Sequence, residues 1–225
     1  MTQTQWNALF PLRFGTHAER MVSLVLRRAG EPGREALEAF IHERFERMHH
    51  ADVQHFLPDL LGLYDSQGRL SAAVGIRLAA GGPLFLEGYL DEPLEAPVSR
   101  LAGRIVGRDE LVEVGNLSAL SAGSARLIIV AVTWLLAARE LNWVAFTGAA
   151  SLVNSFHRLG LEPSVLGRAD PARLNGEGAS WGSYYEQHPQ VFAGDIRYGH
   201  AQLERNRVFE RLGFPLLLTE AGHAA

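Results

Sequence analysis

The first third of the chain carries two different periods of apolar and polar residues. Apolar residues run between charged ones from Arg20 to Arg28, which predicts a strand. From Arg34 to His50 the apolar positions fall on one face at helical spacing, which predicts an amphipathic helix. Leu60–Tyr64 and Leu70–Leu78 are apolar runs joined by the turn sequence DSQG, so they are expected to pair as an antiparallel hairpin. These elements begin an α+β sheet.

The stretch from Leu111 to Arg139 is the most apolar part of the chain. Leu111–Val114 predicts a buried strand that carries one acid, Glu113, and a small-residue loop then leads into a long helix that is apolar on almost all sides. The first N–H groups of such a helix have no partner within it, so a strand, loop and helix of this kind can form an anion site. A plain core unit with a satisfied buried acid fits the same residues. The longest apolar run, Leu127–Ala138, is shorter than the ~20 residues that span a bilayer.

The second half of the chain continues the alternation of strands and helices. Ser151 is expected to cap a helix over Ala150–Leu161, and Gly160 to follow it in a left-handed conformation. The other predicted elements are a central strand over Trp143–Thr147, a strand at Val165–Leu166, a polar loop over Asp170–Ser180 and a last helix over Tyr198–Leu212. No repeat or long linker divides the chain. It is therefore expected to form a single domain over residues 1–225, with an N-terminal extension (1–19) and a C-terminal helix and tail (197–225).

Composition narrows the possible functions. The formal charge of -4 and the pI of about 6.1 argue against a nucleic-acid partner, which needs a basic face. The chain has no Cys and no Lys, which excludes disulfides, thiolate chemistry, a P-loop lysine and a Schiff-base lysine. The N-terminus has no signal-peptide pattern, so a cytoplasmic protein is expected. Its oligomeric state cannot be predicted.

Several common motifs are missing. No G-x-S-x-G elbow marks a hydrolase serine, and no G-x-G-x-x-G follows a strand. His42, Glu46, His49 and His50 share one helix face, but H-E-x-x-H is absent and a solvated polar face explains them, so no metal is predicted. In this order of elements, a phosphate-bearing cofactor would lie where the strand from Leu111 meets the SAGSAR segment.

Three blocks of sequence carry a resemblance to a known family. They are LFLEGYLDEPLE, VEVGNLS and the aromatic block SWGSYYEQHPQVFAGDI, with WVAFTGAASLVNSFHRLGLEP between the last two. Over about residues 55–196 the chain resembles the thermostable hemolysin family of bacterial proteins. That family is similar in fold to GCN5-related and acyl-homoserine-lactone-synthase acyltransferases. The resemblance implies one domain in which helices flank both faces of a mixed, twisted sheet.

The resemblance also implies where an acyl donor binds. In GCN5-like enzymes the strand before the pyrophosphate loop splays from its neighbour and holds the pantetheine arm, which here implies the backbone of Val114, Gly115, Asn116 and Leu117. The usual loop pattern is Q/R-x-x-G-x-G/A, and SAGSAR keeps only its small residues. An acyl carrier protein is therefore implied as much as coenzyme A, with no tightly bound cofactor. The implied donor-binding residues further along are Ser121, Gly123, Ser124, Arg126 and Asn154.

Glu113 resembles the acid on the corresponding strand of acyl-homoserine-lactone synthases, which implies a general base acting through water. Burial in an apolar strand would raise its pKa toward a useful range. Tyr184 or Tyr185 would protonate the leaving thiolate. Backbone N–H groups from Gly115 to Leu117 would stabilise the oxyanion.

Three functions from different classes follow. The first is an acyltransferase that moves an acyl group from a thioester carrier to a small amine or hydroxyl acceptor. The second is a membrane-acting lytic protein, as the family name suggests, although the long helix is buried rather than amphipathic. The third is a non-catalytic binding protein, in which the gap between the strands would be closed and no cavity would lie beside Glu113.

Overall fold

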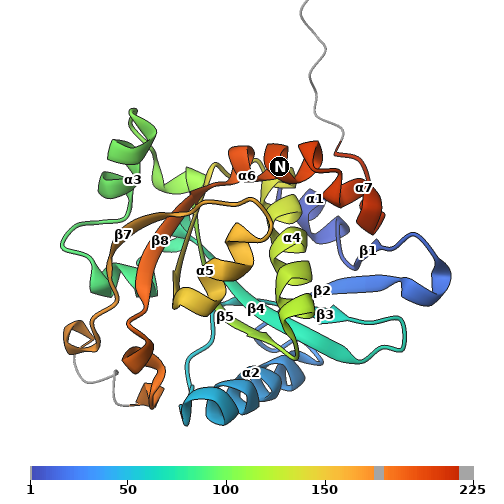
Figure 1. Ribbon diagram of the computed structural model, residues 1–225, viewed down its shortest axis with the longest axis horizontal. Coiled ribbons are helices and arrows are strands. Elements are labelled where there is room, and N and C mark those ends of the chain that lie inside the picture. Colours follow the sequence, from blue (N-terminus) through green and yellow to red (C-terminus); the bar gives the residue numbers. More distant parts are fainter. Residues whose placement is uncertain (1, 175–179, 218–225) are drawn as a thin grey trace, which may run out of the picture.

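The computed structural model describes residues 2–174 and 180–217. The described helices are α1 (Gln3–Ala8), α2 (Arg34–His49), α3 (Glu95–Ala102), α4 (Ala122–Ala138), α5 (Ala150–His157), α6 (Ile196–Arg205) and α7 (Val208–Leu212). The described strands are β1 (Leu12–Phe14), β2 (Val22–Arg28), β3 (Asp59–Tyr64), β4 (Leu70–Leu78), β5 (Leu111–Ala119), β6 (Trp143–Gly148), β7 (Ser164–Arg168) and β8 (Gln190–Asp195). Figure 1 shows helices on both faces of one twisted sheet, as the resemblance implies.

The sheet is mixed, and its strand order is β1-β2-β3-β4-β5-β6-β8-β7. Strands β5 and β6 are parallel, because α4 carries the chain back from the end of one to the start of the other. All other neighbouring pairs are antiparallel, including the predicted hairpin of β3 and β4. The parallel pair therefore lies in the interior of the sheet, and its strand β5 carries Glu113, the predicted base.

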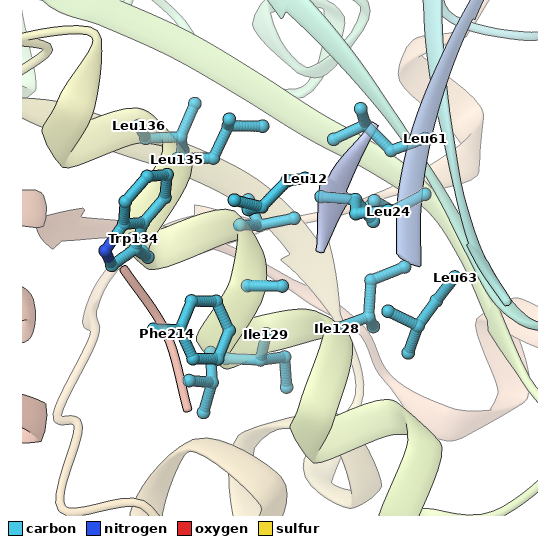
Figure 2. Packing of buried hydrophobic residues seen from close by; sticks show 14 of the residues in the cluster. Leu12, Leu24, Leu61, Leu63, Ile128, Ile129, Trp134, Leu135, Leu136 and Phe214 are labelled. Carbon is cyan, nitrogen blue, oxygen red and sulfur yellow. The ribbon is translucent and has the colours of Figure 1, made fainter. Parts of the chain in front are cut away.

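The larger core lies between α4 and one face of the sheet. Figure 2 shows Trp134, Leu135 and Leu136 of α4 packed with leucines of β1, β2 and β3 and with Phe214. Helices α1, α5, α6 and α7 complete this layer. Trp6 of α1 is fully buried in it, and β1 is the edge strand of the sheet, so the segment predicted as an extension contributes to the core.

The opposite face of the sheet is covered in two parts. Helix α2 packs Leu37 and Ile41 on β3 and β4. Helix α3 and the short 3₁₀ helix η3 (Phe85–Tyr89) cover the region of β5, β6 and β8. Residues of β5 alternate between the two faces, with Leu111 on the α3 side and Val112 on the α4 side. Glu113 consequently faces η3 and α2.

Several predicted boundaries are wrong. The small-residue segment after Val114 is not a loop, because β5 continues to Ala119 by pairing with β4. The SAGSAR segment is the cap and first turn of α4. Helix α5 begins at Ala150 after Ala149, so Ser151 does not cap it, whereas Gly160 does have a positive φ of 74°.

Differences also occur near the C-terminus. The predicted last helix is two helices, since Arg207 between them adopts a φ of 54°. The end of the aromatic block forms β8, which inserts between β6 and β7. Of the predicted polar loop, residues 175–179 lie outside the described residues.

Candidate active site at the gap between β5 and β6

The two parallel strands separate halfway along their length. Paired residues run from Leu111 opposite Trp143 to Val114 opposite Phe146, and the pairing ends there. Beyond this point β5 continues along β4, and β6 continues along β8. The backbone groups of β5 on the side of the gap therefore have no strand partner in the described part of the chain.

A β-bulge lies at the point of separation. Gly75 and Ala73 of β4 pair with Gly115 and Ser118 of β5, so β5 has one extra residue in this interval. Asn116 in the bulge has a φ of 53°, which is left-handed. Its Oδ1 accepts a hydrogen bond of 2.9 Å from the N–H of Leu57, and its Nδ2 donates to the carbonyl of His55 at 3.3 Å. The side chain thus fastens the segment after α2 to the mouth of the gap.

A cavity of about 810 Å³ passes through the gap and extends on both sides of the sheet. Its inner arm lies between β6, α4 and α5, where the walls are mainly apolar side chains. These include Ile129, Val132, Leu136, Val144, Leu152 and Phe156. Such an arm suits an aliphatic chain.

The outer arm lies on the other face, between α2, η3 and the 3₁₀ helix η7 (Tyr184–Gln187). Its wall contains a group of aromatic rings. The ring centroids of Phe45 and Trp181 are 5.7 Å apart, those of Trp181 and Tyr184 are 5.4 Å apart, and Phe85 lies 6.0 Å from Trp181. Its lining combines these rings with polar side chains such as Arg44 and Gln54, in contrast to the mainly apolar inner arm.

Glu113 lines the cavity from β5 and is only 4% exposed. Its two oxygens accept hydrogen bonds from the backbone N–H groups of Phe85 (3.0 Å) and Leu86 (2.9 Å). Burial raises the pKa of Glu113, although these two N–H donors and the nearby Arg77 act in the opposite direction. The carboxyl group therefore has a higher proton affinity than a solvated glutamate.

The two adjacent tyrosines occupy different surroundings. Tyr184 lines the cavity, and burial, followed by the influence of Tyr185, raises its pKa. Tyr185 packs in the cluster beneath η3 and places its hydroxyl 2.6 Å from that of Tyr89. The structure thus brings Tyr184, but not Tyr185, to the same cavity as Glu113.

The other predicted residues fall into two groups. Val114, Gly115, Asn116, Leu117 and Ser121 line the cavity with Glu113. The hydroxyl of Ser121 accepts a hydrogen bond of 3.1 Å from the N–H of Ser124 and caps α4. The remaining residues do not line the cavity: Gly123 and Arg126 border a separate surface hollow, Ser124 lies in the first turn of α4, and Asn154 is exposed on α5.

Sequence reasoning missed several residues of the site. Arg44 and Phe45 of α2, Arg77 of β4 and Ser118 of β5 all line the cavity. Only the register of β4 and β5 reveals that Arg77 is the cross-strand partner of Glu113. Among the described residues, no three His, Asp or Glu side chains are placed to share a metal ion. No helix in the described ranges is long and apolar enough to cross a membrane.

Comparisons with solved structures identify the fold. FeeM, an N-acyl amino acid synthase from uncultured soil microbes, superimposes with a TM-score of 0.54 at 14% identity, covering 82% of this chain and 96% of that chain. BjaI, a coenzyme-A-dependent acyl-homoserine lactone synthase, gives 0.55 at 14% identity, covering 91% and 95%. The acyl-homoserine lactone synthase LasI gives 0.54 at 11% identity, covering 79% and 91%. These likenesses establish a GCN5-related acyltransferase-like fold.

Comparison with sequences gives the family. No curated protein sequence matches the chain. The family model described as thermostable hemolysin matches residues 27–200, which is most of the chain and includes the gap, the cavity and Glu113. The chain belongs to the thermostable hemolysin family.

Proposed function

We propose that the protein is an acyltransferase that moves an acyl group from a thioester carrier to a small amine or hydroxyl acceptor. The observation that carries this proposal is the separation of β5 from β6 beside Glu113, which opens into an apolar inner arm. The synthases that share this fold are named for products or substrates that carry acyl groups. A non-catalytic protein with a closed gap fits these features less well.

The unpaired edge of β5 is the proposed position of the donor. Backbone groups beyond Val114 can pair with an extended amide-containing arm such as pantetheine, as one strand pairs with another. The acyl chain would then enter the inner arm and its thioester would lie at the gap. Coenzyme A and an acyl carrier protein both present such an arm. No tightly bound cofactor is required.

Glu113 is the proposed general base. The acceptor must lose a proton as its nitrogen or oxygen attacks the thioester carbonyl, and a buried carboxylate with a raised pKa is a stronger base than a solvated one. Because both carboxylate oxygens already accept backbone hydrogen bonds, a water molecule would relay the proton. N–H groups of Gly115–Leu117 would stabilise the oxyanion, where one donor contributes about 3 kcal/mol.

Tyr184 is the proposed partner of the leaving sulfur. Its raised pKa lies above the ~8.5 typical of a thiol, so complete proton transfer from Tyr184 to the thiolate would be unfavourable. A hydrogen bond from its hydroxyl to the sulfur would still stabilise the developing charge. The thiolate would finally take up the proton released by the acceptor.

The test is release of free thiol from short- and long-chain acyl thioesters of coenzyme A and of an acyl carrier protein. Val132→Phe places a ring in the inner arm, whereas Leu127→Phe places one on the same helix beside the separate surface hollow. We expect Val132→Phe to lower kcat/KM for long chains about tenfold while short chains and Leu127→Phe remain near wild type. Equal effects on all chain lengths would contradict the proposed acyl arm.

A further inference from the structure

Two residues that line the cavity each carry a buried polar atom without a hydrogen-bond partner among the described residues. In the described part of the chain, four buried side-chain nitrogen or oxygen atoms lack one: Trp6 Nε1, Arg44 Nε, Ser118 Oγ and His200 Nε2. Arg44 and Ser118 line the cavity, and Trp6 and His200 do not. Since buried polar groups are nearly always hydrogen-bonded, two such groups in one cavity point to a ligand that supplies the partner.

Arg44 is not held by any carboxylate of the described chain. Within the described ranges, its one side-chain hydrogen bond is a weak one of 3.7 Å from Nη2 to the sulfur of Met48. Arg47, three positions further along the same helix, is by contrast exposed and pairs with Glu43 at 2.6 Å. The Arg44 guanidinium therefore retains its capacity to bind an anion.

Ser118 lies on the same side of the sheet as Arg44. It is 4% exposed and pairs across the strands with Ala73. Ala73 packs with Leu37 and Ile41 of α2, which is the helix that carries Arg44. The hydroxyl of Ser118 and the guanidinium of Arg44 thus belong to elements that face each other across the outer arm.

The charges of the outer arm favour an anionic ligand. Arg77, whose one hydrogen bond to a described residue is that of 3.3 Å to the carbonyl of Pro83, adds a second guanidinium beside Glu113. The other carboxylates that line the cavity, Glu162 and Asp195, lie with the start of α6 at the far end of the inner arm. Two arginines therefore accompany one acid in the outer arm.

We infer that the outer arm binds an amino acid acceptor, with its carboxylate held by Arg44 and Ser118 and a large, preferably aromatic, side chain against Phe45, Trp181 and Tyr184. A guanidinium and a hydroxyl can both donate to a carboxylate. This inference rests on the proposed acyl transfer. The amino nitrogen forms a bond to the thioester carbonyl carbon, the carbon–sulfur bond breaks, and the thiolate takes the proton that the amine loses. The products are an N-acyl amino acid and a free thiol.

The experiment compares L-phenylalanine, L-phenylalaninamide and phenethylamine as acceptors for wild type, Arg44→Gln, Ser118→Ala and the matched control Arg47→Gln. We expect phenylalanine to be preferred over the two acceptors without a carboxylate by about 100-fold in kcat/KM. Arg44→Gln should raise KM for phenylalanine about tenfold with little change in kcat, and leave phenethylamine unaffected. Arg47→Gln should match wild type.

Calorimetric binding of the same three compounds without any thioester separates this inference from the proposed function. Arg44-dependent binding of phenylalanine without acyl transfer to any amine would support the carboxylate site and count against the acyltransferase. Acyl transfer that is equally fast with phenethylamine would overturn the carboxylate site and leave the acyltransferase standing. An Arg44→Gln effect on the KM of the thioester, with none on that of phenylalanine, would assign Arg44 to the donor and also overturn the inference.

Discussion

The carboxylate of Glu113 accepts a hydrogen bond of 2.9 Å from the backbone N–H of Leu86, although the two residues are 27 positions apart in the chain. Together with the bond from Phe85, this contact fastens the start of η3 to β5. The same carboxyl group lines the cavity. Glu113 thus has two roles, since it holds η3 in place and is the proposed general base. Measurements of stability and of activity can separate these roles.

The first prediction concerns activity against pH. If Glu113 is the base, kcat/KM should fall as the pH drops below its raised pKa, because only the carboxylate can accept the proton. Glu113→Gln should lower kcat at least ~100-fold and flatten this limb of the profile. The amide supplies one acceptor oxygen where two N–H groups need partners, so folding must be confirmed by circular dichroism. Unchanged turnover in a folded Gln variant would remove Glu113 from the mechanism.

The second prediction concerns stability against pH. The folded-state pKa of Glu113 lies above its usual value of 4.5, so the native protein binds this proton more tightly than the unfolded chain. Its contribution to the free energy of unfolding is therefore full below about pH 4.5 and is lost as the pH rises through the folded pKa. Urea unfolding of wild type and Glu113→Gln over this interval should show the decline in wild type alone. Parallel curves would contradict the raised pKa.

The third prediction separates the two tyrosines. Tyr184→Phe removes a hydroxyl from the cavity and should lower kcat about tenfold with little loss of stability. Tyr185→Phe removes the partner of the Tyr89 hydroxyl and should cost about 1 kcal/mol of unfolding free energy while kcat stays near wild type. Thermal unfolding and thiol release measure both. The reverse pattern would assign the sulfur to Tyr185.

The sequence predicts the parts of the fold that depend on local pattern. Hydrophobic periodicity locates α2, the β3–β4 hairpin and the buried helix α4, and the left-handed position of Gly160 follows from its place after a helix. Local pattern fails where pairing overrides propensity. The small residues after Val114 look like a loop, yet they extend β5 because β4 supplies partners on both sides of the bulge at Asn116.

The site is only partly predictable for the same reason. Glu113 stands out as one acid in a β-branched apolar run, and it lies on β5 beside the gap. Arg44 and Ser118 come from segments with ordinary local patterns, and they line the same cavity only because α2 packs over the sheet. Which of Tyr184 and Tyr185 faces the cavity depends on the backbone conformation of η7, and two adjacent tyrosines in a sequence do not reveal it.

The fourth prediction concerns His49, whose ring contacts Tyr184 at a centroid distance of 5.3 Å. Burial lowers the pKa of His49 from its usual 6.5, and its carbonyl accepts a hydrogen bond of 2.7 Å from the N–H of Ser183. The stability due to the neutral ring is therefore full above about pH 6.5 and is lost as the pH falls through the lower folded pKa. Hydrogen exchange of the segment around Tyr184 should accelerate in acid.

His49→Gln should remove this pH dependence, whereas the exposed His17→Gln should keep it. His200 also has a pKa lowered by burial, so the comparison uses the difference between wild type and each variant rather than the wild-type curve alone. Equal acid sensitivity in His49→Gln and wild type would show that another group controls this segment.

The fifth prediction uses Asn116 to separate two contributions to stability, that of its left-handed backbone conformation and that of its hydrogen bond to Leu57. Asn116→Gly tolerates the φ of 53° but leaves the N–H of Leu57 without its acceptor, which should cost about 1–3 kcal/mol. Asn116→Ala loses the same bond and also places a Cβ in a left-handed conformation, so it should be less stable than Asn116→Gly by a further ~1–2 kcal/mol. Chemical unfolding gives both differences.

Because Leu57 and the bulge line the cavity, both variants should also raise KM for the thioester. If the Ala variant equals the Gly variant in stability, the bulge rearranges without Asn116, and the backbone edge of β5 is not held in place by this residue.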